Sequence, residues 1–162
     1  MKLRGRPLSS RYFLRLGILF SLVALLAAGC GGSKAVKPSE DSIKATEAVK
    51  ALNAMQASYE ARDMAGVLKP VSQDFKGGYS EMETSLRKDM DEFPKVSIET
   101  TVERVEIEGD LVKVVFHWFG KWTGKDGKEH EGRGNSIFAF KAAGPAMSLD
   151  SVIGDSPFGV IR

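Results

Sequence analysis

The fold is clearest in residues 96–123, VSIETTVERVEIEGDLVKVVFHWFGKWT. Apolar and polar residues alternate there with a period of two, which is typical of strands with one buried face. The alternation changes phase at Arg104, and this predicts a β-bulge. Gly109 and Asp110 then form a turn signal between two alternating runs. Runs joined by so short a turn pair antiparallel, because parallel neighbours need long crossovers.

The same signals continue toward the C-terminus. Residues 124–127, GKDG, are the next turn signal, and a third strand is expected over about residues 132–141. Gly144 and Pro145 lead into a fourth strand that includes residues 149–153. The second half of the chain therefore predicts a four-stranded antiparallel sheet.

The first half predicts helices instead. Apolar residues recur at spacings of three and four over residues 43–62, with Ser39 as the N-cap. Asp63 is expected to cap a short second helix, and a capping box at residues 80–83 is expected to start a third, which ends at Pro94. The predicted class is α+β, with three N-terminal helices packed on a curved four-stranded antiparallel sheet.

This order of elements resembles the nuclear transport factor 2-like superfamily, which includes SnoaL-like and ketosteroid-isomerase-like proteins. The resemblance is carried by residues 59–68 (YEARDMAGVL), 72–75 (SQDF) and 148–155 (SLDSVIGD). It covers residues 43–155, which we assign to one domain. It implies a cone-shaped, cystatin-like fold in which the sheet curls around the helices and encloses an apolar cavity.

The N-terminal residues look like a targeting signal. A basic segment precedes an apolar run over residues 16–29, which is shorter than the roughly 20 residues that a membrane-spanning helix needs. The run ends in Ala27-Ala28-Gly29-Cys30, which resembles the lipobox of bacterial lipoproteins. We expect a cleaved signal peptide at residues 1–29 and a lipidated Cys30 that starts a flexible tether over residues 30–42. An uncleaved anchor or an ordinary signal peptide is the alternative.

Lipidation would give the lone cysteine a role, since one cysteine cannot form a disulfide within this chain. The expected partner is membrane lipid, reached through acylated Cys30. Gly31 follows the cysteine where aspartate tends to mark inner-membrane retention, so the resemblance favours a bacterial outer membrane, with the domain facing the periplasm. Five of the 23 basic residues and none of the 21 acidic residues precede Cys30, which leaves a mature net charge of about −3. No basic cluster appears, so nucleic-acid binding is not expected.

No catalytic set is found. The residues at the positions of the ketosteroid isomerase trio are Met55, Tyr79 and Ser136, which do not supply its tyrosine, general base and protonated acid. The two histidines, His117 and His130, lack a close cysteine or a carboxylate at ligand spacing, so no metal site and no cofactor are expected. His117 is predicted to be solvated.

Aromatic residues dominate the candidate pocket. The pocket-lining set is Met55, Tyr59, Phe75, Tyr79, Phe116, Trp118, Ser136 and Phe138. These side chains would either enclose a ligand or simply fill the core. Trp122 and the tail at residues 156–162 are expected to add exposed or edge-like apolar surface.

The leading functional hypothesis is a non-catalytic, lipid-anchored envelope protein that binds a small apolar ligand or an envelope partner. One alternative is a pocket enzyme of isomerase, dehydratase or cyclase type that uses Tyr59 or Tyr79 as proton donor. Another is a structural module that forms homodimers through its open sheet face.

Overall fold

The computed structural model describes residues 37–143 and 146–160. Its elements follow in the order α2 (Glu40–Glu60), α3 (Met64–Leu68), α4 (Tyr79–Glu92), β1 (Lys95–Glu108), β2 (Leu111–Thr123), β3 (Glu129–Ala143) and β4 (Ala146–Gly154). They belong to a compact unit that begins at Pro38, and the predicted signal peptide and Cys30 lie outside the described residues. The expected α+β class is confirmed.

The four strands form one sheet in the order β1-β2-β3-β4, with every neighbouring pair antiparallel. The predicted bulge is confirmed, because the β1–β2 register shifts between Val102 and Arg104. The β2–β3 hairpin is longer than expected, since Thr123 still pairs with Glu129 immediately beside the turn. A second register shift, between Ala139 and Phe140, lies in the β3–β4 pair and has no signal in the sequence pattern.

Two of the three expected helix caps are confirmed. The Ser39 side chain accepts a hydrogen bond from the Ser42 amide, and Asp63 accepts one from the Gly66 amide. The capping box predicted at residues 80–83 is wrong. Helix α4 begins at Tyr79, so Ser80 already lies inside the helix and Gly78 is the N-cap. The φ of Gly78 is 79°, a conformation that suits glycine.

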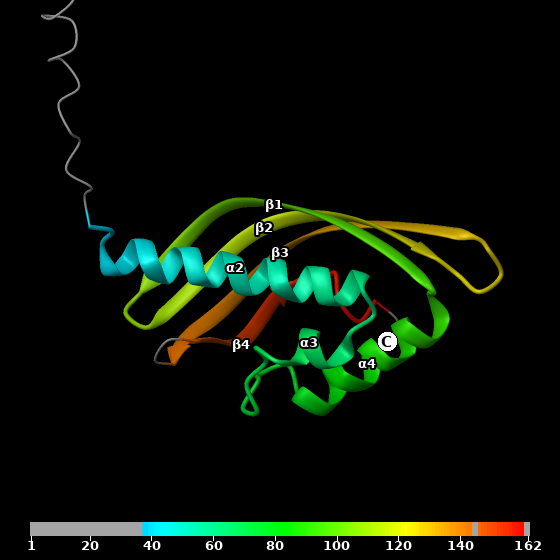
Figure 1. Ribbon diagram of the computed structural model, residues 1–162, viewed down its shortest axis with the longest axis horizontal. Helices are drawn as coiled ribbons and strands as arrows, with labels where there is room; N and C mark the ends of the chain where they lie inside the picture. The colour runs from blue at the N-terminus through cyan, green and yellow to red at the C-terminus, as the bar shows by residue number, and fades with distance from the viewer. Residues whose placement is uncertain (1–36, 144–145, 161–162) are drawn as a thin grey trace, which may run out of the picture. The chain divides into compact units, whose positions relative to one another are not determined.

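Helix α2 is the centre of the packing. It contacts α3 and all four strands, and β1 and β2 arch over it while α3 and α4 lie together on its other side (Figure 1). Its buried face is formed by Ala48, Leu52, Met55 and Tyr59, at the predicted helical spacing. These side chains contact inward residues of β2 and β3, among them Phe116 and Phe138. The rings of these two phenylalanines pack edge to face, with their centroids 5.1 Å apart.

Both edges of the sheet have polar partners outside the ladder. At the β1 edge, Gln56 donates to the Ile98 carbonyl at 2.6 Å and Glu60 accepts from the Ile98 amide at 2.6 Å. At the β4 edge, Leu149 exchanges backbone hydrogen bonds with Pro70 and Ser72 in the loop before α4. Strand edges that are paired or covered in this way are poor templates for aggregation.

The expectation that Trp122 and the tail would be exposed is wrong for the two large rings. Trp122 and Phe158 are each 3% exposed and belong to the main core. The indole fits because Gly120 and Gly132 leave the space beside it open, where a Cβ would lie 2.2 Å and 3.2 Å from the ring. Phe158 is buried because the tail turns back against Tyr59 and Phe138.

Candidate functional site

A buried polar cluster lies where α2, α4 and the sheet meet. Tyr59, which is 1% exposed, donates its phenol proton to Oδ2 of Asp89 at 2.5 Å, and Asp89 on α4 is equally buried. Trp122 of β2 donates its indole N–H to the Tyr59 oxygen at 3.1 Å. Each of these polar groups is therefore satisfied inside the core, as buried polar groups generally are.

The cluster holds Tyr59 in its neutral form. Burial is the main cause that raises the pKa of Tyr59 well above its ordinary value of 10.0, and the hydrogen bond to Asp89 raises it further. Hydrogen bonds from Trp122 and the Gly159 backbone lower this pKa, but they do not outweigh burial. At neutral pH the Tyr59 phenol keeps its proton and donates it in the hydrogen bond to Asp89.

The C-terminal tail covers this cluster. Phe158 places its ring edge-on to Tyr59, with centroids 5.3 Å apart, and to Phe138 at 5.9 Å. The backbone N–H of Val160 donates to Oδ2 of Asp89 at 2.7 Å. Oδ2 of Asp89 thus accepts hydrogen bonds both from Tyr59 and from the tail, which couples the tail to the core.

An open groove of about 640 Å³ lies on the other side of the tail, between α4, the end of β4 and the loop before α4. Its walls combine apolar side chains with hydroxyl groups and one residue of each charge. They are formed by Phe75, Gly77, Ser80, Glu81, Met82, Thr84, Ser85, Lys88, Val152, Gly154, Ser156, Phe158 and Gly159. The volume is within the range of small-molecule sites, and the mixed lining suits a ligand with both apolar and polar parts.

The structure brings most of the predicted pocket residues together in the packed core rather than around the groove. Met55, Tyr59, Phe116, Ser136 and Phe138 are each at most 1% exposed. The Ser136 hydroxyl and the Trp118 indole both donate to the carbonyl oxygen of Asp155, at the base of the tail. Phe75 is the one member of the set that lines the groove, and the half-buried Tyr79 begins α4.

Sequence reasoning missed Asp89, the tail and the groove. Asp89 follows Leu86 by three positions, so it lies on the apolar stripe of α4, and an acid on such a stripe is the signal that was available. Phe158 carries no periodic pattern, because a tail of a few residues is too short for one. The groove depends on where the tail turns, which no local pattern encodes.

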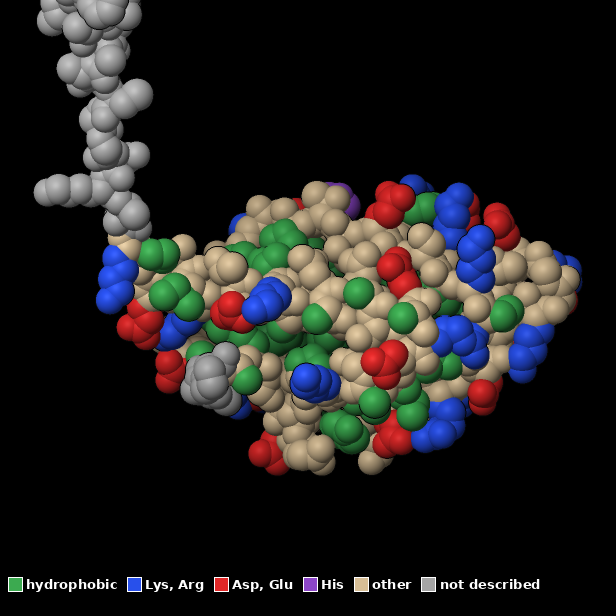
Figure 2. Space-filling model, in the orientation of Figure 1, with side chains coloured by type: hydrophobic (Ala, Val, Ile, Leu, Met, Phe, Trp, Pro, Cys, Tyr) green, Lys and Arg blue, Asp and Glu red, His purple; other side chains and the backbone are tan. Residues whose placement is uncertain are grey.

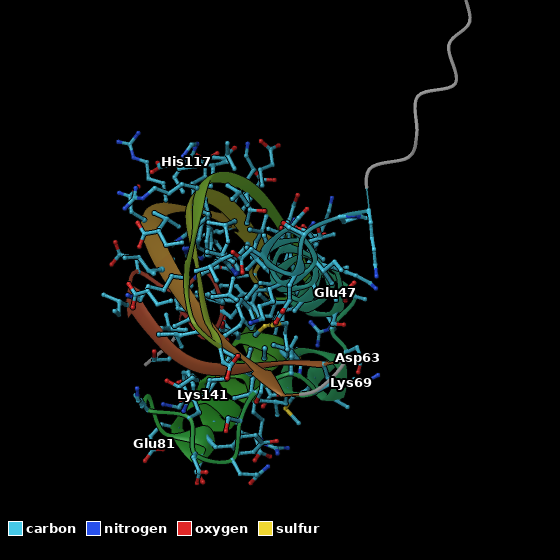
Figure 3. The ribbon with its side chains drawn as sticks, turned by 90° about the vertical axis from the view of Figure 1, so that its left-hand side faces the viewer. Glu47, Asp63, Lys69, Glu81, His117 and Lys141 are labelled. Atoms are coloured by element: carbon cyan, nitrogen blue, oxygen red, sulfur yellow. The ribbon has the colours of Figure 1, made fainter. Side chains whose placement is uncertain are left out.

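The histidines do not form a metal site with other described residues. Within residues 37–143 and 146–160, no three His, Cys, Asp or Glu side chains are grouped to hold a metal ion. His117 lies at the outer surface (Figure 3), where its side chain is 52% exposed, so its predicted solvation is confirmed. It does have a carboxylate partner, since Nδ1 lies 3.2 Å from Oε1 of Glu103.

Charged side chains of both signs are interspersed over the face of the molecule in Figure 2. On the outer face of the sheet, Lys121 pairs with Glu131 at 3.0 Å and its ammonium group lies 5.6 Å from the centre of the Phe119 ring. No helix in the described part of the chain is both long enough and apolar enough to cross a membrane.

Comparison with solved structures identifies the fold. A nuclear transport factor 2-like superfamily protein from Salmonella enterica superposes with a TM-score of 0.61 at 13% identity, over 74% of this chain and 94% of the other. A putative aromatic ring hydroxylase from Novosphingobium aromaticivorans gives 0.59 at 15% identity, over 75% and 93%. A hexachlorocyclohexane dehydrochlorinase (LinA) gives 0.56 at 8% identity, over 70% and 84%.

These similarities show that the chain has the nuclear transport factor 2-like fold, as its order of elements predicted. No protein-family sequence model matches the chain, and no curated protein matches it in sequence. Proteins with this fold have unrelated activities, so function has to be argued from the site.

Proposed function

We propose that this protein is a lipid-anchored, non-catalytic binding protein of the bacterial cell envelope, and that its groove beside α4 takes a small, partly apolar ligand. The groove carries this proposal, because it is the open concave surface described above and combines apolar walls with hydroxyl groups. Acylation of Cys30 would hold the domain at the membrane, and Gly31 favours the outer membrane.

The state of Tyr59 argues against the enzyme alternative. A general acid has to reach the substrate atom that it protonates. Tyr59 is 1% exposed and bonded to Asp89, so its proton is not presented to the groove. The dehydrochlorinase and the putative hydroxylase share their fold with this chain. A shared fold does not assign a catalytic role to any residue of this chain.

The ligand proposal is tested with two variants on the same helix. Thr84 lines the groove, whereas the exposed Arg87 pairs with Glu83 and is absent from the lining. We expect Thr84→Trp to abolish binding of small molecules from an envelope extract, as seen by ligand-observed NMR, and Arg87→Trp to leave it intact. Equal binding to both variants, or chemical conversion of the bound molecule, would overturn the proposal.

The anchor is tested separately. Cells fed a palmitate analogue should label the wild-type chain and leave Cys30→Ala unlabelled, and processing should stop when the lipoprotein signal peptidase is inhibited. Labelling that persists in Cys30→Ala would exclude the anchor without bearing on the groove.

A further inference from the structure

The groove beside α4 is bordered by a strand edge that is open over part of its length. β4 is the last strand of the sheet, so only one of its sides pairs with another strand, β3. On its other side, the loop over residues 70–76 bonds to the backbone of Leu149 and Asp150. That pairing ends there. Among the residues that the structure describes, Val152 and Gly154 have no hydrogen-bond partner outside the β3–β4 ladder.

The unpaired backbone groups of this edge point toward the groove. In an antiparallel pair, successive residues turn their N–H and C=O alternately toward the partner strand and away from it. Leu149 turns both groups away from β3, toward the loop, and at the other end Asp155 turns its N–H toward β3. With Asp150 as the extra residue of the bulge, both ends give the same phase, which directs Val152 and Gly154 away from β3. These two residues line the groove.

Helix α4 leaves room beside this edge for another strand. No Cα atom of α4 lies within 8 Å of a Cα atom of β4, whereas neighbouring strands lie about 4.8 Å apart. The groove of about 640 Å³ lies between the helix and the strand. Its apolar lining is formed by Phe75, Met82, Val152 and Phe158. An added strand would therefore find backbone partners on one side and an apolar surface for a side chain.

The two charged residues of the lining match the ends of a short peptide. Glu81 and Lys88 lie seven positions apart on α4, which is about 10 Å along the helix axis. Neither side chain forms an ion pair or a hydrogen bond with any other described residue. An extended chain advances about 3.3 Å per residue, so about three residues span the same distance. A free tripeptide could bring its ammonium group to Glu81 and its carboxylate to Lys88.

We infer that the groove binds an extended peptide of about three residues with an apolar central side chain, which pairs with the backbone of Val152 and Gly154 as an added strand. This inference rests on the proposed ligand-binding role of the groove and names the ligand class. In strand addition, main-chain hydrogen bonds supply affinity and pockets for alternate side chains supply specificity. The tail stays in place, and Phe158 forms part of the wall.

The first experiment changes the backbone of the peptide. The probe is threonyl-phenylalanyl-threonine, together with two isomers in which an ester oxygen replaces the N–H of the second or of the third residue. Successive residues of a strand direct their N–H groups to opposite sides, so only one isomer loses a donor to β4. We expect that isomer to bind wild-type protein roughly tenfold more weakly than the peptide, and the other isomer to bind within about twofold of it, in NMR titrations.

The second measurement shows where the peptide lies. Strand pairing protects an N–H from exchange with solvent, and the amides of Val152 and Gly154 face the groove. With about nine-tenths of the protein bound, we expect hydrogen exchange to slow about tenfold at one or both of these amides. The control is Gly109, an exposed residue of the β1–β2 turn, whose exchange should not change.

A matched pair of variants changes the same strand edge. Val152→Pro removes the N–H that faces the groove and puts the proline ring in its place, and proline is tolerated where the N–H of an edge strand is unpaired. Val152→Ala keeps the N–H and shortens the side chain. We expect the proline variant to bind the tripeptide about tenfold more weakly than the alanine variant. The ester isomers are measured on wild-type protein, so the test holds even if Val152→Pro does not fold.

The end charges are tested with the amidated tripeptide, which lacks the carboxylate. Exposed ion pairs contribute little, so amidation should weaken binding to wild-type protein by about two- to fivefold. The same change should have no effect on binding to Lys88→Met, which lacks the partner charge.

Four results would overturn the inference. They are no binding of the tripeptide at millimolar concentration, equal binding of the two ester isomers, unchanged exchange at both Val152 and Gly154, and an equal effect of amidation in wild type and Lys88→Met. A peptide that shifts the Thr84 signal without protecting the edge amides would refute strand addition and leave the proposed function standing. Failure of the proposed function is instead read from the Thr84→Trp and Arg87→Trp pair.

Discussion

At the scale of single residues, the Tyr59 hydroxyl joins three elements of the core. It donates to Asp89 and accepts from Trp122, so one oxygen atom links α2, α4 and β2. Such networks stabilise a fold only when every member is satisfied, because unpaired polar groups in a core are costly.

The change Tyr59→Phe tests this role while it keeps the ring. It removes the acceptor for the Trp122 indole and one of the donors to Asp89, which keeps the Val160 N–H. At about 1 to 3 kcal/mol for a buried polar group that loses its partner, and about 1 kcal/mol for a lost hydrogen bond, we expect a loss of roughly 3 kcal/mol in the free energy of unfolding. Chemical denaturation measures it. The half-buried Tyr79 provides the control, and Tyr79→Phe should change stability by less than about 0.5 kcal/mol.

At the scale of elements, Arg62 ties α2 to the end of α4. Its guanidinium donates to the carbonyls of Met90 and, at 2.5 Å, Phe93, where the last turn of α4 leaves acceptors unpaired. In this position Arg62 has a strained, left-handed backbone conformation, with φ of 61°. The effect of the hydrogen bonds and the effect of the backbone strain can be separated by replacing Arg62 with alanine or with glycine.

Arg62→Ala loses the hydrogen bonds and keeps the strained backbone, so it should lower the free energy of unfolding by about 1 to 3 kcal/mol. Arg62→Gly loses the same bonds but adopts positive φ freely, and it should be more stable than the alanine variant by about 1 kcal/mol. Denaturation of the two variants in parallel gives both differences. An alanine variant as stable as wild type would show that the arginine does not cap α4.

The β2–β3 hairpin depends on glycines opposite its indoles. A Cβ on Gly134 would lie 2.9 Å from the Trp118 ring and 2.6 Å from Cβ of Asp155, closer than real contacts allow. Gly134→Ala should therefore destabilise the protein by roughly 1 to 3 kcal/mol and disturb the base of the tail. Gly132→Ala is the matched control, since its nearest ring atom is 3.2 Å away, and it should cost less. Thermal unfolding of both variants provides the comparison.

At the scale of the whole molecule, the sequence predicts the features that follow a periodic pattern of residues along the chain. It does not predict contacts between segments that are distant in the sequence. The strand alternation, the bulge at Arg104 and the stripe of α2 were readable because each follows a local period. The partner of Tyr59 could not be predicted in this way, because Asp89 lies 30 residues away and only packing brings the two residues together. The burial of Phe158 was missed for the same reason, and with it the position of the groove.

Global stability should fall on both sides of neutral pH, for different reasons. The pKa of Asp150 is lowered, chiefly by hydrogen bonds from Lys141 and then Lys76. A lowered pKa in the folded state means that its contribution is present above the unfolded value of 3.8 and is lost as the pH falls through the folded value. Asp150→Asn should therefore flatten the acid limb of a plot of unfolding free energy against pH.

The alkaline limb belongs to Tyr59, whose pKa is raised in the folded state by burial and by Asp89. The contribution of such a group is complete below its unfolded pKa of 10.0 and is lost as the pH rises from there toward the folded value. We expect the free energy of unfolding to decline above about pH 10 in wild type and to decline less steeply in Tyr59→Phe. Denaturant titrations at a series of pH values measure both slopes. Parallel slopes in the two proteins would show that ionisation of Tyr59 does not cause the alkaline limb.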